Sequence, residues 1–176
     1  MKKIISITLS LLILFMLCNC TKKTPNPNEK EPVNIQKQIA VSLYYANEKY
    51  IETGNEELEK FIVVKKPIDL KNNNIVLSIV NELKKNPNIN NATTGIPENV
   101  AFLDGKIKDK IAYVDVSSEN LSGSSLQEFF VINQILYSLT FLDDIEKVQF
   151  LIDGKKEESL MGHFLINEPL STNVNP

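Results

Sequence analysis

The sequence predicts an α+β domain with one small sheet in β-β-α-β-β-α-β order and two helices packed on one face of that sheet. Two patterns carry this prediction. Several short segments place apolar residues on alternate positions, which is typical of strands with one buried face. Two longer segments instead repeat apolar residues every three or four positions, as amphipathic helices do. No internal repeat interrupts this order, which favours a single domain over residues 38–170.

The first half of this domain is expected to contain two strands and a helix. Apolar residues alternate over residues 39–45, and a second apolar segment covers residues 58–65 after the turn signal Gly54-Asn55. These segments are interpreted as strands that can pair as a hairpin. Residues 75–83 then show helical spacing, with asparagines before them as caps.

The second half is expected to add a hairpin and a longer helix. Apolar residues 100–103 and 111–116 are separated by charged residues and are interpreted as the two strands of the hairpin. Ser125 and Glu128 have the spacing of a capping box, and a mostly apolar helix follows them. The apolar stripe of this helix is so wide that we expect the helix to pack against more than one neighbour.

Two further segments complete the predicted sheet. Residues 147–153 place apolar side chains on alternate positions and end in the turn sequence Asp153-Gly154, which predicts the last core strand. Residues 163–167 precede a proline and are expected to form a short edge strand. Residues 171–176 are expected to be a disordered tail.

The N-terminal residues have the features of an export signal. Two lysines precede an apolar run over residues 4–17, which is shorter than the roughly 20 residues of a membrane-spanning helix. Residues 17–20, Leu-Cys-Asn-Cys, resemble the bacterial lipobox, in which the last cysteine receives the lipid. We therefore expect residues 1–19 to be a lipoprotein signal peptide and Cys20 to be the site of lipid attachment. Cys18 is a rival acceptor, and a plain secretory signal is the alternative.

Composition restricts the function of the mature chain. Residues 20–37 are expected to be the lipidated cysteine and a disordered tether, because three prolines lie among polar residues there. Two of the 19 lysines and none of the 22 acidic residues fall in the signal, so the mature formal charge is −5. This charge and the absence of arginine disfavour nucleic-acid binding. The glycines form no phosphate-binding cluster, and we expect no cofactor.

The side chains that are candidates for chemistry have structural explanations. Asp115 lies between two valines and, with Ser117, is expected to accept backbone hydrogens at a strand end rather than to act in catalysis. Asp153 is expected to form a turn with the glycine that follows it. His163 is the only histidine, and the sequence places no carboxylate at a spacing that predicts a site with it. We therefore expect no catalytic residue and no metal ligand, and predict that the protein is not an enzyme.

Six short motifs lie in order along the domain. They are Tyr44-Tyr45-Ala46, Gly95-Ile96-Pro97, Ala112-Tyr113-Val114-Asp115-Val116-Ser117, Leu136-Tyr137-Ser138-Leu139-Thr140, Val148-Gln149-Phe150-Leu151-Ile152-Asp153-Gly154 and Gly162-His163. Together they resemble the GerMN domain family of bacterial sporulation and spore germination proteins over residues 39–169. The resemblance implies a small α+β domain similar to the ring-building modules of secretion machines, and a role in assembly. The best-known member has two such domains in tandem, whereas this chain has room for one.

The anchor, the tether and the resemblance together predict a non-enzymatic protein that is lipid-anchored on the extracytoplasmic face of the cell membrane. We expect it to bind envelope or sporulation proteins as an assembly component in sporulation or spore germination. The alternative is a general cell-envelope lipoprotein that binds a wall component or assists a signalling or wall enzyme. The sequence leaves the partner, the oligomeric state and the binding surface open.

Overall fold

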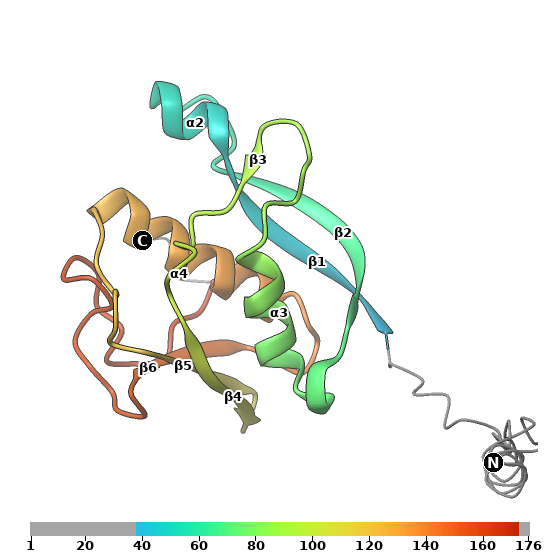
Figure 1. Cartoon of the computed structure of the whole chain (residues 1–176), viewed down its shortest axis with the longest axis vertical. Coiled ribbons are helices and arrows are strands. Elements are labelled where there is room, and N and C mark those ends of the chain that lie inside the picture. Colours follow the sequence, from blue (N-terminus) through green and yellow to red (C-terminus); the bar gives the residue numbers. More distant parts are fainter. Residues whose placement is uncertain (1–37, 173–176) are drawn as a thin grey trace, which may run out of the picture. The chain divides into compact units, whose positions relative to one another are not determined.

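A computed structural model describes residues 38–172 of the chain, and Figure 1 shows how its elements are arranged. The predicted signal peptide, Cys20, the tether up to residue 37 and residues 173–176 of the tail lie outside the described residues. Within residues 38–172, no helix combines the length and the apolar character needed to cross a bilayer. In chain order the elements are β1 (Gln38–Asn47), α2 (Glu48–Thr53), β2 (Phe61–Asp69), η1 (Lys71–Asn73), α3 (Ile75–Leu83), β3 (Ala92–Thr93), β4 (Phe102–Lys108), β5 (Ile111–Val116), α4 (Ser125–Thr140) and β6 (Lys147–Ile152).

The strands form two three-stranded sheets, so the prediction of one sheet is wrong. The first sheet has the order β2-β1-β3 and the second has the order β4-β5-β6. β1 and β2 pair antiparallel along their length, and β4 and β5 form an antiparallel hairpin. β5 and β6 run parallel, which requires a crossover connection, and α4 supplies it.

The two main helices contact both sheets, which corrects the prediction that they cover one face of one sheet. α3 contacts β1 and β2 as well as β4 and β5, and α4 contacts β1 and β6. The physical reason is the width of the apolar surface of α4, which has to be covered on more than one side, as predicted. Its buried apolar residues are Phe130, Val131, Ile132, Ile135, Leu136 and Leu139. The α+β class is confirmed.

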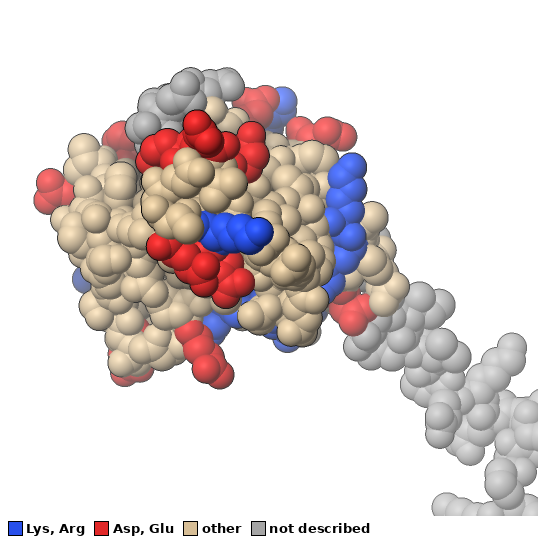
Figure 2. Space-filling model, turned by 90° about the horizontal axis from the view of Figure 1, so that it is seen from above, with Lys and Arg blue, Asp and Glu red and all other residues tan. Residues whose placement is uncertain are grey.

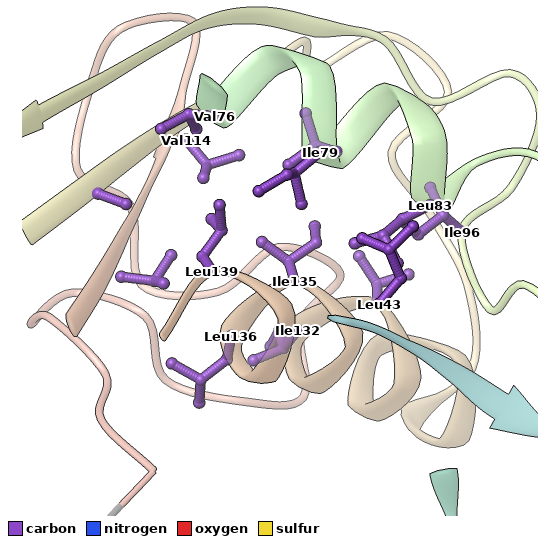
Figure 3. Packing of buried hydrophobic residues seen from close by; sticks show 14 of the residues in the cluster. Leu43, Val76, Ile79, Leu83, Ile96, Val114, Ile132, Ile135, Leu136 and Leu139 are labelled. Carbon is purple, nitrogen blue, oxygen red and sulfur yellow. The ribbon is translucent and has the colours of Figure 1, made fainter. Parts of the chain in front are cut away.

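The centre of the hydrophobic core is the contact between α3 and α4. In Figure 3, Val76, Ile79 and Leu83 of α3 lie on the side that faces Ile135 and Leu139 of α4. All five side chains are at most 1% exposed. Because full burial of one such side chain is worth about 1.5–3 kcal/mol, this contact is a principal source of stability.

α3 begins where the sequence predicts it, at an asparagine cap. Asn74 Oδ1 accepts a hydrogen bond from the Leu77 amide at 3.0 Å, and Asn74 Nδ2 donates to the carbonyl oxygen of Gly105 at 2.7 Å. One side chain therefore caps the helix and ties it to β4. The strand approaches this closely because it has glycine there: a Cβ on Gly105 would lie 2.7 Å from Val76 Cγ1.

The loop that contains Gly95 packs directly against α4. A Cβ on Gly95 would lie 2.5 Å from Phe130 Cβ and 2.7 Å from Gln134 Oε1. The Gly95 amide donates a hydrogen bond to that Gln134 oxygen, and Ile96 is buried in the core. The glycine allows the close approach and the isoleucine anchors the loop, so this sequence motif is a packing element.

Two strand boundaries differ from the sequence prediction. β2 begins and ends a few residues later than predicted, and β4 continues to Lys108 instead of ending at residue 103. β4 tolerates its lysines because it is an edge strand whose exposed side chains face solvent. The turn of the hairpin is Asp109-Lys110, with φ values of 52° and 60°, as type I′ turns require.

The first turn of α4 does not form the predicted capping box. The cap is Ser124, whose hydroxyl accepts a hydrogen bond from the Gln127 amide at 3.2 Å. Glu128 instead points inward and is 0% exposed. Its carboxylate accepts hydrogen bonds from three amides of the loop after β6, those of Leu160 at 3.0 Å, Met161 at 2.9 Å and His163 at 2.8 Å.

Residues 163–167 do not form the predicted edge strand. The amide of His163 is already taken by Glu128, and the segment is held by separate contacts rather than by a ladder. Gln149 Nε2 donates to the carbonyl oxygen of Ile166 at 2.7 Å, and an isolated antiparallel bridge joins Val148 to Leu170. The segment is a loop pinned to β6 and to the start of α4.

Replacement of Glu128 by glutamine is expected to lower the free energy of unfolding by about 2–3 kcal/mol, because an amide nitrogen would replace an acceptor oxygen and face a donor. Urea unfolding measures the loss, and hydrogen exchange at residues 160–163 should accelerate. The exposed Glu157 lies in the same loop, and Glu157→Gln should change stability by less than about 0.5 kcal/mol. Equal stabilities of the two variants would contradict the role of Glu128.

Gly95→Ala is expected to destabilise the domain by about 1–3 kcal/mol, because its Cβ would overlap atoms close to the backbone of α4. Gly123→Ala is the matched control. Its Cβ would also come close to other atoms, but these are Gln127 Oε1 at 2.5 Å and Met161 Sδ at 2.8 Å, which belong to flexible side chains that can move. Urea unfolding of both variants should show a clear loss only at Gly95, and similar losses would argue against this explanation.

Candidate functional site

A groove of about 900 Å³ opens where β1, β2 and the C-terminal end of α4 meet. Five of its lining residues are aromatic, and we call it the aromatic groove. It is lined by Tyr44, Glu56, Glu57, Leu58, Glu59, Lys60, Phe61, Val63, Phe129, Tyr137, Thr140, Phe141 and Thr172. Because these residues come from distant parts of the chain, the groove exists only in the folded domain.

The floor of the aromatic groove is a set of rings in mutual contact. The rings of Phe61 and Tyr137 have centroids 5.2 Å apart in an edge-to-face arrangement, and those of Tyr44 and Tyr137 are 5.5 Å apart. Phe61 also contacts Phe129, at 6.1 Å. Such pairs contribute about 0.5–1.5 kcal/mol beyond simple burial. The amide of Tyr44 donates to the Ser138 hydroxyl at 2.9 Å, which ties β1 to α4 beneath the rings.

The rim of the aromatic groove is the segment between α2 and β2, and it contains Glu56, Glu57, Glu59 and Lys60. α2 ends at Gly54 in the left-handed conformation that suits glycine, and the Gly54 amide donates to the carbonyl oxygen of Tyr50 at 2.8 Å. This sharp helix end turns the chain back across the groove. Three carboxylates against one ammonium make the rim acidic.

Glu56 and Lys60 form a small polar cluster with an aromatic neighbour. The Tyr50 hydroxyl donates to Glu56 Oε1 at 2.9 Å, and Lys60 Nζ lies 3.4 Å from Glu56 Oε2. The Tyr50 hydrogen bond and the nearby Lys60 lower the pKa of Glu56. Partial desolvation would lower the pKa of Lys60, but Tyr50 and Glu56 outweigh it and hold this pKa above its ordinary value.

The C-terminal end of α4 adds negative potential to the aromatic groove. Thr140 and Phe141, which end the helix, line the groove, and the last turn contains no basic residue. The C-terminus of a helix carries a partial negative charge, which a basic residue would otherwise offset. Figure 2 looks down on the end of the domain where α2 lies, and it shows acidic side chains on both sides of a basic one.

The two aspartates singled out in the sequence meet at the ends of β5 and β6. Asp115 Oδ1 accepts a hydrogen bond from the Gly154 amide at 2.8 Å, which confirms its expected role as an acceptor of backbone hydrogens. Asp153 Oδ1 accepts one from the Ser118 amide at 3.2 Å. Asp153 and Gly154 have positive φ values of 48° and 78°, which confirms the predicted turn. Each carboxylate therefore accepts a hydrogen bond from the segment at the end of the other strand, and the two bonds hold the strand ends together.

His163 is exposed at the other end of the loop that Glu128 holds. Its Nε2 atom lies 3.2 Å from the carbonyl oxygen of Gly123. Asp153 is engaged elsewhere, with the Ser118 amide at the ends of β5 and β6. Over residues 38–172, the structure contains no group of three or more side chains of the kinds that bind metal ions.

Sequence reasoning noted most residues of the aromatic groove but did not assemble them. Tyr44 and Tyr137 lie in motifs of the family resemblance, and Phe129 and Tyr137 belong to the wide apolar stripe of the second predicted helix. Their spacing of eight residues places both rings on one side of the helix. This spacing is the feature of the sequence that indicates that the two rings lie on the same surface. The signal does not identify Phe61 or the acidic rim as neighbours, because these come from another part of the chain.

Residues 42–158 match the model of the family Germane, which is described as sporulation and spore germination. The chain is similar to the solved tandem GerMN domains of the sporulation protein GerM from Bacillus subtilis, with 25% identity and a TM-score of 0.59. That match covers 85% of this chain and 49% of the tandem structure, so this chain corresponds to about half of it. The aromatic groove, apart from Thr172, lies within the matched family region.

Two further solved structures share the fold. The first GerMN domain of GerM from Bacillus subtilis is 19% identical with a TM-score of 0.59, and the match covers 77% of this chain and 99% of that domain. A Clostridium perfringens protein that is provisionally described as a lipoprotein is 22% identical with a TM-score of 0.52, covering 79% of this chain and 91% of that one. No curated protein matches the chain.

Hydrogen bonds from Ser118 hold the pKa of Asp153 below its ordinary value. Because the folded pKa is depressed, this contribution to stability is present above about pH 4 and is lost as the pH falls through the folded pKa. Ser118→Ala removes the largest cause and should raise the pKa of Asp153, as measured by carboxyl carbon NMR. Ser122→Ala, in the same exposed loop, should leave it unchanged. An unchanged pKa in Ser118→Ala would refute the assignment.

Proposed function

Because the chain belongs to the Germane family of sporulation and spore germination domains, we propose that it is a non-enzymatic envelope protein that binds another protein through the aromatic groove. The family match and the GerM structures confirm the GerMN resemblance that the sequence motifs predict. The proposed role is that of an assembly component in sporulation or spore germination, with a lipid anchor at Cys20 that holds the domain on the extracytoplasmic face of the membrane.

The observation that carries the proposal is the aromatic groove. Tyrosine and phenylalanine are enriched in protein interfaces relative to the rest of the surface, and they bury a large apolar area with few rotatable bonds. Phe141 fits this description best, since it is 52% exposed at the end of a rigid helix. An exposed ring beside a preformed groove is the arrangement expected of an interface anchor.

The anchor rests on the sequence of residues 17–20 and has support from one relative. The Clostridium perfringens protein of the same fold is provisionally described as a lipoprotein. Two acyl chains bind a bilayer far more firmly than one, so a diacylated Cys20 would keep the domain at the membrane. A protein confined to a surface meets partners on that surface at a raised effective concentration, which suits an assembly component.

Binding, rather than catalysis, accounts for the polar groups of the aromatic groove. Glu56 is engaged by Tyr50 and Lys60, and this ion pair stabilises the ionised form of both groups. A general base needs a pKa near the working pH, whereas the pKa of Glu56 is displaced away from neutrality. The rim is thus suited to electrostatic recognition.

Photocrosslinking from Phe141 tests the proposal. The photoreactive amino acid p-benzoylphenylalanine replaces Phe141 in the whole protein, in cells of its own host that are irradiated while they make it. We expect a covalent adduct of defined mass with an envelope protein, identified by mass spectrometry. Ile107, an exposed residue of β4 outside the groove, is the matched control position and should give no such adduct.

Two results would reject parts of the proposal. The same adducts from both positions would show that the groove is not a specific docking site. Adducts that contain wall glycan and no protein would favour the alternative of a general envelope lipoprotein that binds a wall component. Loss of the protein adduct in Cys20→Ala, with the protein still produced, would support the need for the anchor.

A further inference from the structure

Lys60 shows which chemical group the aromatic groove accommodates. Its ammonium lies 5.4 Å from the centroid of the Tyr50 ring and 5.6 Å from that of the Phe129 ring. It also lies 3.4 Å from a carboxylate oxygen of Glu56. An ammonium between aromatic faces and a carboxylate gains both cation–π attraction and ion pairing. Lys60 thus shows, within this chain, how aromatic rings and a carboxylate together bind a lysine ammonium.

The rest of the aromatic groove also has aromatic rings and carboxylates, but its lining contains no cation besides Lys60. Tyr44, Tyr137 and Phe141 supply the rings. Glu57 and Glu59 supply carboxylates on the rim, where both residues are exposed to solvent. The C-terminal end of α4 adds partial negative charge at the same place. Lys60 is the single basic residue in the lining and is already paired with Glu56.

Building on the function proposed above, we propose that the aromatic groove receives a lysine side chain from a basic segment of the partner protein. The aliphatic stem of that lysine lies along the rings of Tyr44, Tyr137 and Phe141, and its ammonium reaches Glu57 and Glu59. A long side chain with an apolar stem and a charged end matches a groove with an apolar floor and an acidic rim. Charge complementarity of this kind selects against acidic partners and raises the association rate.

The charge of the rim separates this partner from a neutral ligand. A basic peptide loses affinity when the rim carboxylates are neutralised or when salt screens them. A neutral wall glycan that stacks on the rings would be nearly indifferent to both changes. Anionic surfaces, such as a bilayer rich in acidic lipids, would be repelled by the rim.

The probe is a fluorescein-labelled hexalysine peptide with an amidated C-terminus. Its binding to the whole protein, purified in a non-ionic detergent, is followed by fluorescence anisotropy at low salt. The double variant Glu57→Gln/Glu59→Gln should bind about fivefold more weakly, and Phe141→Ser about threefold more weakly. The matched control is Glu48→Gln/Glu52→Gln, which makes the same change of charge on α2 outside the groove lining and should retain nearly full affinity.

Lys60 gives a test in the opposite direction. Lys60→Gln frees the place between the Tyr50 and Phe129 rings and removes a repulsive charge, so hexalysine should bind about threefold more tightly. Lys49→Gln removes the same charge from α2, outside the groove lining, and should have a smaller effect. Urea unfolding of every variant checks that the fold is retained.

Four outcomes would overturn the inference. Equal losses in the two double glutamine variants would mean that hexalysine responds only to overall charge. Absence of binding at millimolar peptide would mean that the groove does not receive lysine, as would a Lys60→Gln protein that binds no better than Lys49→Gln. Soluble wall glycan that binds the groove independently of rim charge would replace the basic segment with a neutral ligand.

The failure of this inference can be told from failure of the proposed function. If Phe141 crosslinks to an envelope protein but hexalysine does not bind, the groove docks a protein by other chemistry. If hexalysine binds in the groove but Phe141 captures no envelope protein in cells, the lysine site stands and the assembly role fails.

Discussion

The burial of α4 on nearly all sides is the constraint from which most of the structure follows. Its apolar residues must be covered by β1 on one side, β6 on another and α3 on a third, which is why two sheets enclose the helices. Its polar residues need partners inside the same enclosure. Ser138 accepts the Tyr44 amide, Gln134 accepts the Gly95 amide and Glu128 accepts the amides of the C-terminal loop. Each of these three side chains thereby positions one neighbouring segment.

This enclosure also has a cost within the described part of the chain. Gln134 Nε2 is buried without a hydrogen-bond partner there, although Gln134 Oε1 holds the Gly95 loop. An unpaired buried donor costs about 1–3 kcal/mol. The carbonyl group of Gln134 recovers part of this cost, because it satisfies an amide that the close approach of the loop would otherwise leave buried. The loop and the helix therefore depend on each other for both packing and hydrogen bonding.

The aromatic groove forms where this enclosure ends. Near its C-terminal end α4 buries Leu139 in the core but turns Tyr137 and Phe141 outward, so these two rings are covered only in part. The segment before β2 crosses the opening and adds acidic side chains, one of which holds Lys60 near the rings. Rigid elements thus support an open apolar surface with a charged rim. The same helix that organises the core supplies the surface on which the proposed recognition depends.

The sequence by itself determined the α+β class, an asparagine cap from residues 72–74 before α3, the turn at Asp153, the hydrogen-bonding role of Asp115 and the family resemblance. These features depend on periodicity and on local chemistry, which are visible within a few residues. Only the tertiary structure decided that the strands form two sheets, that Glu128 holds a distant loop instead of capping its own helix, and that Tyr44, Phe61 and Tyr137 share one groove. Apolar spacing specifies which face of a segment is buried but not which distant segment covers it, because that choice depends on the packing of the whole domain.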